Sequence, residues 1–173
     1  MKRRAVFLDR DGVLVRAAAL GAYAHGPLTL EDFALLPGVT EPVRQLHDAG
    51  FVTILATNQP AIARGQMSQD TLDEMHRRLR AAVRLDEIEV CPHRDSDHCV
   101  CRKPKPGMLL AAAEKLALDL PGSYLIGDTA RDVGAALAAG VTPVLIDWPY
   151  NQDLRAPLRV RNLAEAAALI LLR

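Results

Sequence analysis

The chain has 173 residues, of which half are apolar and 24% are charged, and its 21 basic side chains match its 21 acidic ones. This length suits a single α/β domain with a substantial core, and we expect residues 1–173 to form one. The zero net charge and the 4% aromatic content argue against a surface that binds nucleic acid.

The start of the chain and its apolar runs favour a cytoplasmic protein. Residues 2–4 are basic, but only the apolar segment 5–8 follows before Asp9, which is too short for a secretory signal. No uncharged apolar run is long enough for a membrane span. We therefore expect a cytoplasmic protein without a membrane partner. We also expect a monomer, because no segment has the pattern of an exposed apolar stripe.

Short apolar runs alternate with helical patterns along the chain, which is typical of a Rossmann-like α/β fold, an open parallel sheet with helices on both faces. Strands are predicted at residues 5–8, 51–56, 88–91, 124–127 and 141–147. Helices are predicted at 41–49, 68–84, 107–118 and 130–139. Asn162 and Glu165 form a capping pair that predicts a terminal helix. Residues 15–37 and 147–161 are expected to be loops or small caps, with no large cap domain.

Three of the predicted strands end in polar side chains. Asp9 follows the first strand, Thr57 and Asn58 follow the second, and Asp128 follows a later one. In an open parallel sheet the carboxyl ends of the strands lie along one edge, where ligands bind. We therefore expect these residues to converge, although they are far apart in sequence.

Asp9 and Asp11 are two carboxylates separated by one residue, directly after a strand. Gly12 permits the turn that redirects the chain after them. One carboxylate could attack phosphorus while the other reaches the leaving group from the same side. Taken alone, this pair is more often a solvated acidic turn than a catalytic site.

Further residues at the same edge fit phosphoryl transfer. Asp128 supplies a third carboxylate, and Mg²⁺ prefers carboxylates, water and phosphate oxygens as ligands. Thr57 offers a hydroxyl and Asn58 an amide to phosphate oxygens, and Lys103 offers a compact positive charge. Phosphoryl transfer is catalysed mainly by positioning and by neutralising developing charge, so such a set is sufficient.

Four segments carry these residues in a fixed order, and they resemble the four motifs of the haloacid dehalogenase superfamily of phosphatases. The segments are LDRDG at 8–12, ATNQ at 56–59, CRKPKPGM at 101–108 and GDTARD at 127–132. The resemblance spans roughly residues 4–147. It is closest to the small cap-less subgroup, which includes the heptose-1,7-bisphosphate 7-phosphatases and the histidinol-phosphate phosphatases.

The resemblance implies a role for each matched residue. Asp9 would be the nucleophile and a Mg²⁺ ligand. Asp11 would be the general acid and then the general base, and would bind Mg²⁺ through its backbone carbonyl. Thr57 and Lys103 would stabilise the phosphoryl group, and Asp128 would complete the Mg²⁺ site. Substrate would be bound by Asn58, Gln59 and Arg102.

The three cysteines of the chain all lie between residues 91 and 101, together with two histidines. Cys91, His93, Cys99 and Cys101 make a set of three thiolates and one imidazole, which is typical of a structural zinc site. Four protein ligands leave no open position, so zinc would stabilise the loop at 91–101 without taking part in the reaction. His98 is a possible substitute ligand. The same loop occurs in the subgroup named above.

The sequence favours the heptose enzymes over the histidinol enzymes as the closer match. Tyr23 with His25, LPGV at 36–39 and IARG at 62–65 resemble segments of the heptose enzymes. Three positions depart from their pattern, namely Arg16 for a usual Asn, Pro60–Ala61 for a common Ser–Gly, and Thr129 where a Lys often follows the metal-binding Asp. The short zinc loop suits both groups, so histidinol phosphate stays an alternative substrate.

Two alternatives belong to other functional classes. A receiver-type signalling domain also uses an acidic cluster, a Thr and a Lys around a phosphorylated Asp, but it would not need Asp11 as an acid and base. A zinc-ribbon-like module for nucleic acid or protein partners would leave the carboxylates without a role. A phosphatase for nucleic-acid ends is a related variant, and it would need a basic groove that the composition does not indicate.

Overall fold

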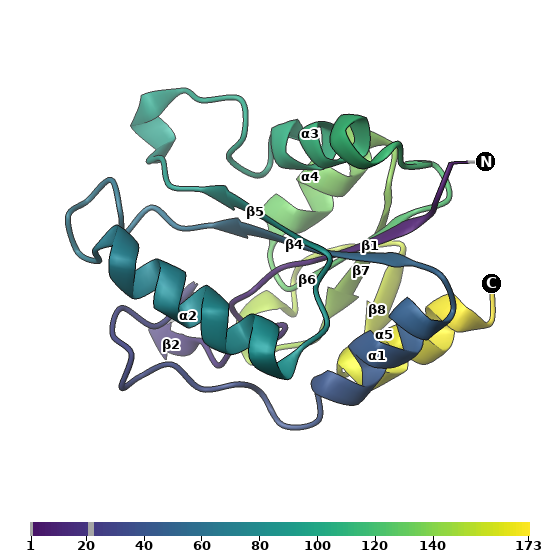
Figure 1. Cartoon of the computed structure of the whole chain (residues 1–173), viewed down its shortest axis with the longest axis horizontal. Coiled ribbons are helices and arrows are strands. Elements are labelled where there is room, and N and C mark those ends of the chain that lie inside the picture. The colour runs from purple at the N-terminus through teal and green to yellow at the C-terminus, as the bar shows by residue number, and fades with distance from the viewer. Residues whose placement is uncertain (1, 21–22) are drawn as a thin grey trace.

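The computed structural model describes residues 2–20 and 23–173, and its centre is a parallel sheet of six strands (Figure 1). The strand order is β5-β4-β1-β6-β7-β8, and each neighbouring pair is parallel. The strands are β1 (Ala5–Leu8), β4 (Val52–Asn58), β5 (Glu87–Cys91), β6 (Tyr124–Gly127), β7 (Thr142–Ile146) and β8 (Leu158–Val160).

Helices cover both faces of this sheet, which confirms the predicted fold class. On one face lie α1 (Thr40–Asp48), α2 (Gln69–Ala82) and α5 (Leu163–Leu171), and on the other lie α3 (Gly107–Leu116) and α4 (Ala130–Ala139) (Figure 1). Among the helices in the described parts of the chain, none is long and apolar enough to cross a membrane.

The central strand β1 shows how the apolar pattern builds two cores. Side chains of a strand point alternately to opposite faces, and all four residues of β1 are buried. Val6 and Leu8 pack in the core under α1 and α5, whereas Ala5 and Phe7 pack in the core under α3 and α4. A fully buried strand of this kind is expected where helices cover both faces of a parallel sheet.

The order of the strands places the polar strand ends together. From β1 the chain builds outward through β4 and β5, and it then returns to β6 on the other side of β1. The crevice at such a reversal of strand order is the usual ligand site of an open α/β sheet. Asp9, Asn58 and Asp128 lie at the carboxyl ends of these three adjacent strands, as the sequence predicted.

Side-chain caps begin two of the helices, and the cap at Asn162 was predicted. Ser68 accepts a hydrogen bond from the amide of Thr71 at 3.1 Å at the start of α2. Asn162 accepts one from the amide of Glu165 at 2.9 Å at the start of α5. Strand β4 extends through Thr57 and Asn58, two residues further than predicted, because it pairs with β5 along that length.

The segments expected to be irregular contain short elements that carry little sequence signal. Residues 15–37 include a hairpin of β2 (Ala18–Leu20) and β3 (Tyr23–His25), and 147–161 include the short helix η2 (Pro149–Asn151) and β8. Three-residue strands are too short for an alternating pattern to be seen in the sequence. The side chain of Tyr23 lies outside the described part of the structure.

Candidate active site

The ammonium group of Lys103 lies at the centre of the candidate active site. Only 2% of this side chain is exposed, and Nζ lies 2.9 Å from Oδ1 of Asp9 and 2.5 Å from Oδ1 of Asp132. Nζ also donates a hydrogen bond to the carbonyl of Ala56 at 2.7 Å. Burial alone would lower the pKa of Lys103, but the Asp132 and Asp9 carboxylates raise it above its usual value, so the group stays charged.

Asn58 holds the main chain of Lys103 in place. Its Nδ2 donates to the carbonyl of Lys103 at 3.0 Å, and its Oδ1 accepts from the amide of Lys103 at 3.1 Å. Sequence reasoning assigned Asn58 to the substrate, whereas the structure uses both ends of its amide within the protein. Asn58 therefore positions Lys103, and since it also lines the cavity, its contact with the substrate stays a prediction.

Three carboxylates, those of Asp9, Asp128 and Asp132, are close enough to share one cation, with an oxygen from each within 4.8 Å of the others. Burial and the charge of Asp132 raise the pKa of Asp9 to about 7. Burial and the charge of Asp9 raise the pKa of Asp128 to about 8. A divalent cation would remove this repulsion, and carboxylate oxygens are suitable ligands for Mg²⁺.

Hydrogen bonds distinguish the roles of Asp132 and Asp128. Besides Lys103 on Oδ1, Asp132 accepts bonds on Oδ2 from the amide and the hydroxyl of Thr129, at 3.0 and 2.6 Å. By contrast, Oδ1 of Asp128 is buried and has no hydrogen-bond partner among the described residues. A buried carboxylate oxygen without a partner is costly unless a ligand satisfies it. Asp128 and Asp9 are thus the carboxylates that fit a bound cation.

The carboxylate of Asp11 lies in a separate network. It accepts hydrogen bonds from Nε of Arg10 at 2.9 Å, from Nη2 of Arg10 at 3.1 Å and from Nε2 of Gln59 at 3.0 Å. Arg10 is completely buried. Asp11 is not one of the three clustered carboxylates, and its role as acid and base stays a prediction. Its predicted contact with Mg²⁺ through the backbone carbonyl stays a prediction.

Gln59 links this network to Thr57. Its Nε2 donates to Oγ1 of Thr57 at 2.9 Å as well as to Asp11, and its Oε1 accepts from Arg10 at 2.9 Å. Only 4% of Gln59 is exposed. The side chain of Gln59 therefore orients Asp11 and Thr57, and its predicted contact with the substrate stays a prediction.

A cavity of about 610 Å³ opens over these residues, and its lining carries both signs of charge. The acidic side chains are those of Asp9, Asp11 and Asp128. Besides Lys103, the basic side chains come from three segments of the chain, namely Arg64, Arg102 and Arg131. Of these, only Arg102 was predicted, and it is 7% exposed with Nε 2.8 Å from Oδ1 of Asp95.

Tyr150 contributes to the site from the loop after β7, where no motif indicated it. Its hydroxyl donates a hydrogen bond to Oδ2 of Asp128, so this bond leaves Oδ1 as the free oxygen. The ring of Tyr150 stacks on Trp148 with centroids 6.1 Å apart. Nε1 of Trp148 in turn donates to the carbonyl of Gly12 at 2.9 Å. The two aromatic side chains therefore connect Asp128 to the turn after Asp11.

Gly12 is required at that turn for two reasons. Its φ of +83° lies in the left-handed region, which favours glycine, and a side chain at this position would collide with the carboxylate of Asp128 and the hydroxyl of Tyr150. The close approach of the turn to Asp128 brings the first and fourth motifs into contact.

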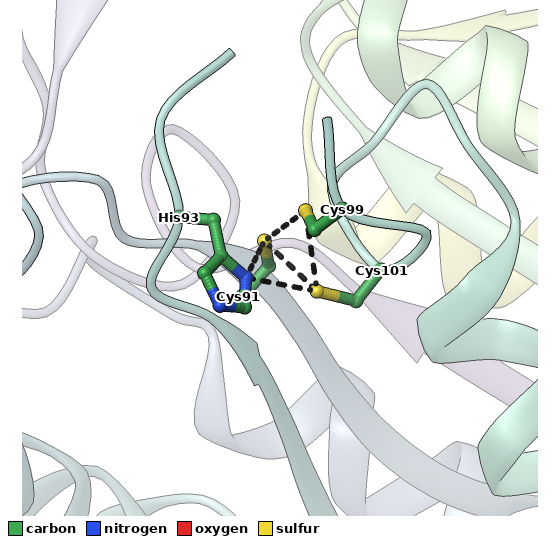
Figure 2. A group of neighbouring side chains, drawn as sticks. All are labelled: Cys91, His93, Cys99 and Cys101. Atoms are coloured by element: carbon green, nitrogen blue, oxygen red, sulfur yellow. Dashed lines mark hydrogen bonds between the residues drawn. The ribbon is translucent and has the colours of Figure 1, made fainter. Parts of the chain in front are cut away.

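The four residues of the predicted zinc set meet in one place (Figure 2). The sulfur atoms and Nδ1 of His93 lie 3.2–3.6 Å apart in neighbouring pairs, and all four lie within 4.8 Å of one another. In a tetrahedral zinc site with bond lengths of about 2.0–2.3 Å, ligand atoms are roughly 3.5–3.8 Å apart. The arrangement therefore fits zinc, and exposed His98 lies outside the cluster.

Comparison with known proteins identifies the relatives of this chain. Residues 100–148 match a family of HAD-hydrolase-like proteins. The chain is 44% identical to a D-glycero-beta-D-manno-heptose-1,7-bisphosphate 7-phosphatase of Pseudomonas putida, over 82% of this chain and 81% of that protein. It is 39% identical to the protein of the same name from Escherichia coli K12, over 94% and 96% of the two chains.

A solved structure supports the same relationship. The D,D-heptose 1,7-bisphosphate phosphatase from B. bronchiseptica, crystallised with magnesium and phosphate, superposes with a TM-score of 0.85. The two chains are 31% identical, and the match covers 98% of each.

The raised pKa values predict how magnesium should stabilise the protein at different pH. Asp9 and Asp128 keep their protons at pH 6, and as the pH rises through about 7 to 8 they ionise and repel each other. This repulsion destabilises the cation-free protein at higher pH, and Mg²⁺ binds the ionised form. We expect Mg²⁺ to raise the Tm by several degrees more at pH 8 than at pH 6, measured by calorimetry. An equal or larger rise at pH 6 would contradict this.

Replacing Tyr150 by Phe should weaken magnesium binding. The substitution removes the hydroxyl that holds Oδ2 of Asp128 but keeps the ring that stacks on Trp148. Loss of such a supporting hydrogen bond typically lowers metal affinity about 10-fold or more. Titration calorimetry with Mg²⁺ would measure the effect. Tyr124→Phe is the matched control, because Tyr124 lies in the apolar core at the opposite end of β6.

Proposed function

The chain belongs to the haloacid dehalogenase family of phosphatases, and from that membership we propose that it removes the 7-phosphate of heptose 1,7-bisphosphate in a Mg²⁺-dependent reaction. The observation that carries the proposal is the cluster of Asp9, Asp128 and Lys103, in a chain 44% identical to a phosphatase named for that substrate. All the relatives described above carry the heptose name, which favours this substrate over histidinol phosphate.

In the first step, a carboxylate oxygen of Asp9 attacks the phosphorus of the 7-phosphate. The bond between phosphorus and the sugar oxygen breaks, and Asp11 donates a proton to that oxygen as it leaves. In the second step, Asp11 accepts a proton from water, whose oxygen attacks the phosphorus of the aspartyl phosphate. This step releases inorganic phosphate and restores the Asp9 carboxylate.

The surrounding residues stabilise the charge that moves through these steps. The Lys103 ammonium lies beside the Asp9 oxygen and can stay close to the transferring phosphoryl group. Thr57 presents its hydroxyl from the end of β4, where Gln59 orients it. Mg²⁺ held by Asp9 and Asp128 would neutralise the phosphate oxygens during the attack. Arg10 and Gln59 hold Asp11 for both proton transfers.

We propose that zinc binds to Cys91, His93, Cys99 and Cys101 and makes the loop at 91–101 rigid. Burial raises the pKa of the Cys91 thiol to about 12, so a cation is needed to hold this residue as a thiolate. The loop is connected to the active site, because Arg102 follows Cys101 directly. Nη1 of Arg102 also donates a hydrogen bond to the carbonyl of His93 at 3.2 Å. Zinc would thus fix the segment that places Arg102 and Lys103 in the active site.

We also propose that the protein is a cytoplasmic monomer.

Phosphate release tests the proposed activity. Wild-type protein should release phosphate from heptose 1,7-bisphosphate with Mg²⁺ and not with EDTA, and Asp9→Asn should lose the activity. L-histidinol phosphate, assayed in parallel, should be hydrolysed far more slowly. A preference for histidinol phosphate would assign a different substrate to the same mechanism, and release unaffected by Asp9→Asn would overturn the mechanism.

Removal of one zinc ligand should affect metal content, stability and activity together. Cys101→Ala is expected to lose bound zinc, measured by mass spectrometry of the metal, to lower the Tm, and to reduce kcat, because Arg102 and Lys103 follow directly. Val100→Ala is the control, since Val100 lies in the same loop with its side chain 77% exposed. A zinc-free protein with full activity would contradict this proposal.

A further inference from the structure

The loop at 91–101 carries every cysteine of the chain, and the reaction described above uses none of them. Figure 2 shows that the three sulfur atoms meet in one cluster. The Sγ atoms of Cys91 and Cys99 lie 3.6 Å apart, and Sγ of Cys101 lies 3.2 Å from the first and 3.5 Å from the second. A disulfide has an S–S bond of about 2.05 Å, so a shift of roughly 1–2 Å would join two of these sulfurs.

Cys99 is the most accessible of the three cysteines to a small oxidant in solution. Cys91 is completely buried, whereas Cys99 and Cys101 are half-buried. Cys101 is followed by the buried side chain of Arg102, but Cys99 adjoins Val100, whose side chain is 77% exposed. A zinc-bound cysteine is a thiolate, and the thiolate is the form of cysteine that reacts with oxidants. Oxidation of the cluster would therefore begin at Cys99.

The cysteine cluster is joined to the active site on two sides. On one side, the carbonyl of Cys91 accepts a hydrogen bond from the amide of Gln59 at 2.7 Å. The side chain of Gln59 in turn donates to the carboxylate of Asp11 at 3.0 Å. On the other side, Lys103 lies two residues after Cys101. Loss of the metal would therefore loosen both the group that holds Asp11 and the segment that carries Lys103.

We propose that Cys99 is a redox modification site, at which oxidation by a peroxide joins Cys99 to Cys91, releases zinc and reversibly lowers the phosphatase activity. The inference rests on the proposed function, because it requires the zinc site and the reaction proposed above. Cys91 is the partner because a disulfide between Cys99 and Cys101 would span only one residue, which strains the bond. In the cytoplasm, a reversible disulfide is typical of catalytic or redox-sensing cysteines.

The oxidation consumes one peroxide and two thiolates in two steps. The Cys99 thiolate attacks one oxygen of hydrogen peroxide, the O–O bond breaks, hydroxide leaves, and Cys99 becomes a sulfenic acid. The Cys91 thiolate then attacks the Cys99 sulfur, the S–S bond forms, the S–O bond breaks, and a second hydroxide leaves. The two sulfurs together lose the two electrons that reduce the peroxide. Only His93 and Cys101 remain as zinc ligands, which is too few for a four-coordinate site.

Treatment of the zinc-loaded full-length protein with hydrogen peroxide tests the modification site. A chromogenic chelator would measure the released zinc, and a thiol reagent would count the remaining thiols. We expect one zinc to be released for every two thiols lost, and a non-reducing peptide map to show a disulfide between Cys91 and Cys99. Dimedone, which traps sulfenic acids, should label Cys99. Zinc and thiols that survive the peroxide, or dimedone label on Cys101 in place of Cys99, would overturn the assignment.

Activity measured on the same samples tests the link to the active site. The kcat for heptose 1,7-bisphosphate should fall roughly 10-fold or more when all zinc is released, as is usual when supporting groups around a catalytic metal site are lost. Dithiothreitol followed by Zn²⁺ should restore it. Diamide, which oxidises thiols but not methionine, is the control and should give the same loss. Activity that persists after zinc release, or a loss that dithiothreitol and Zn²⁺ do not reverse, contradicts the link.

The metal and thiol measurements separate this inference from the proposed function. Zinc release with the disulfide, in a protein inactive on heptose 1,7-bisphosphate, would support the modification site, and p-nitrophenyl phosphate would then report the activity. Hydrolysis of the bisphosphate by a protein whose zinc and thiols survive the peroxide would contradict the modification site alone. A protein that binds no zinc contradicts both the zinc site and its oxidation.

Discussion

The arrangement of the active site depends on one buried ammonium group, that of Lys103, which lies between Asp9 and Asp132. A buried charge is stable only when its partners are in place, and loss of one partner typically costs about 3–5 kcal/mol. Asn58 fixes the main chain of Lys103, and Thr129 and the start of α4 fix Asp132. This one ammonium group therefore fixes the positions of β1, β4, the loop at 91–101 and α4 relative to one another.

The need to hold Lys103 in a fixed position also explains why the loop at 91–101 should be rigid. The described chain has only a small hairpin and loops around the cavity, so the residues that bind the substrate must be held by the loops themselves. Arg102 bonds to the carbonyl of His93, and Lys105 donates to the carbonyl of Cys99 at 2.6 Å. A metal at the four clustered side chains would therefore limit the motion of the segment that carries Arg102, Lys103 and Lys105.

Much of this architecture could be predicted from the sequence, and the exceptions have a common physical cause. The strand ends at Asp9, Asn58 and Asp128 and the four clustered cysteine and histidine residues follow from local patterns and spacing. Arg10 and Tyr150 could not be predicted, because their roles depend on which side chains the fold places beside them. For the same reason the hydrogen bonds of Asn58 with Lys103, and of Gln59 with Asp11 and Thr57, could not be predicted.

The central claim is that Asp9 forms a covalent bond to the phosphoryl group, and acid quenching during the first turnover tests it most directly. Enzyme mixed with heptose bisphosphate labelled at the 7-phosphate should carry transient acid-stable label, and peptide mapping should place the label on Asp9. Asp9→Asn should carry none. Product formation without any labelled protein, or label on another residue, would contradict the account.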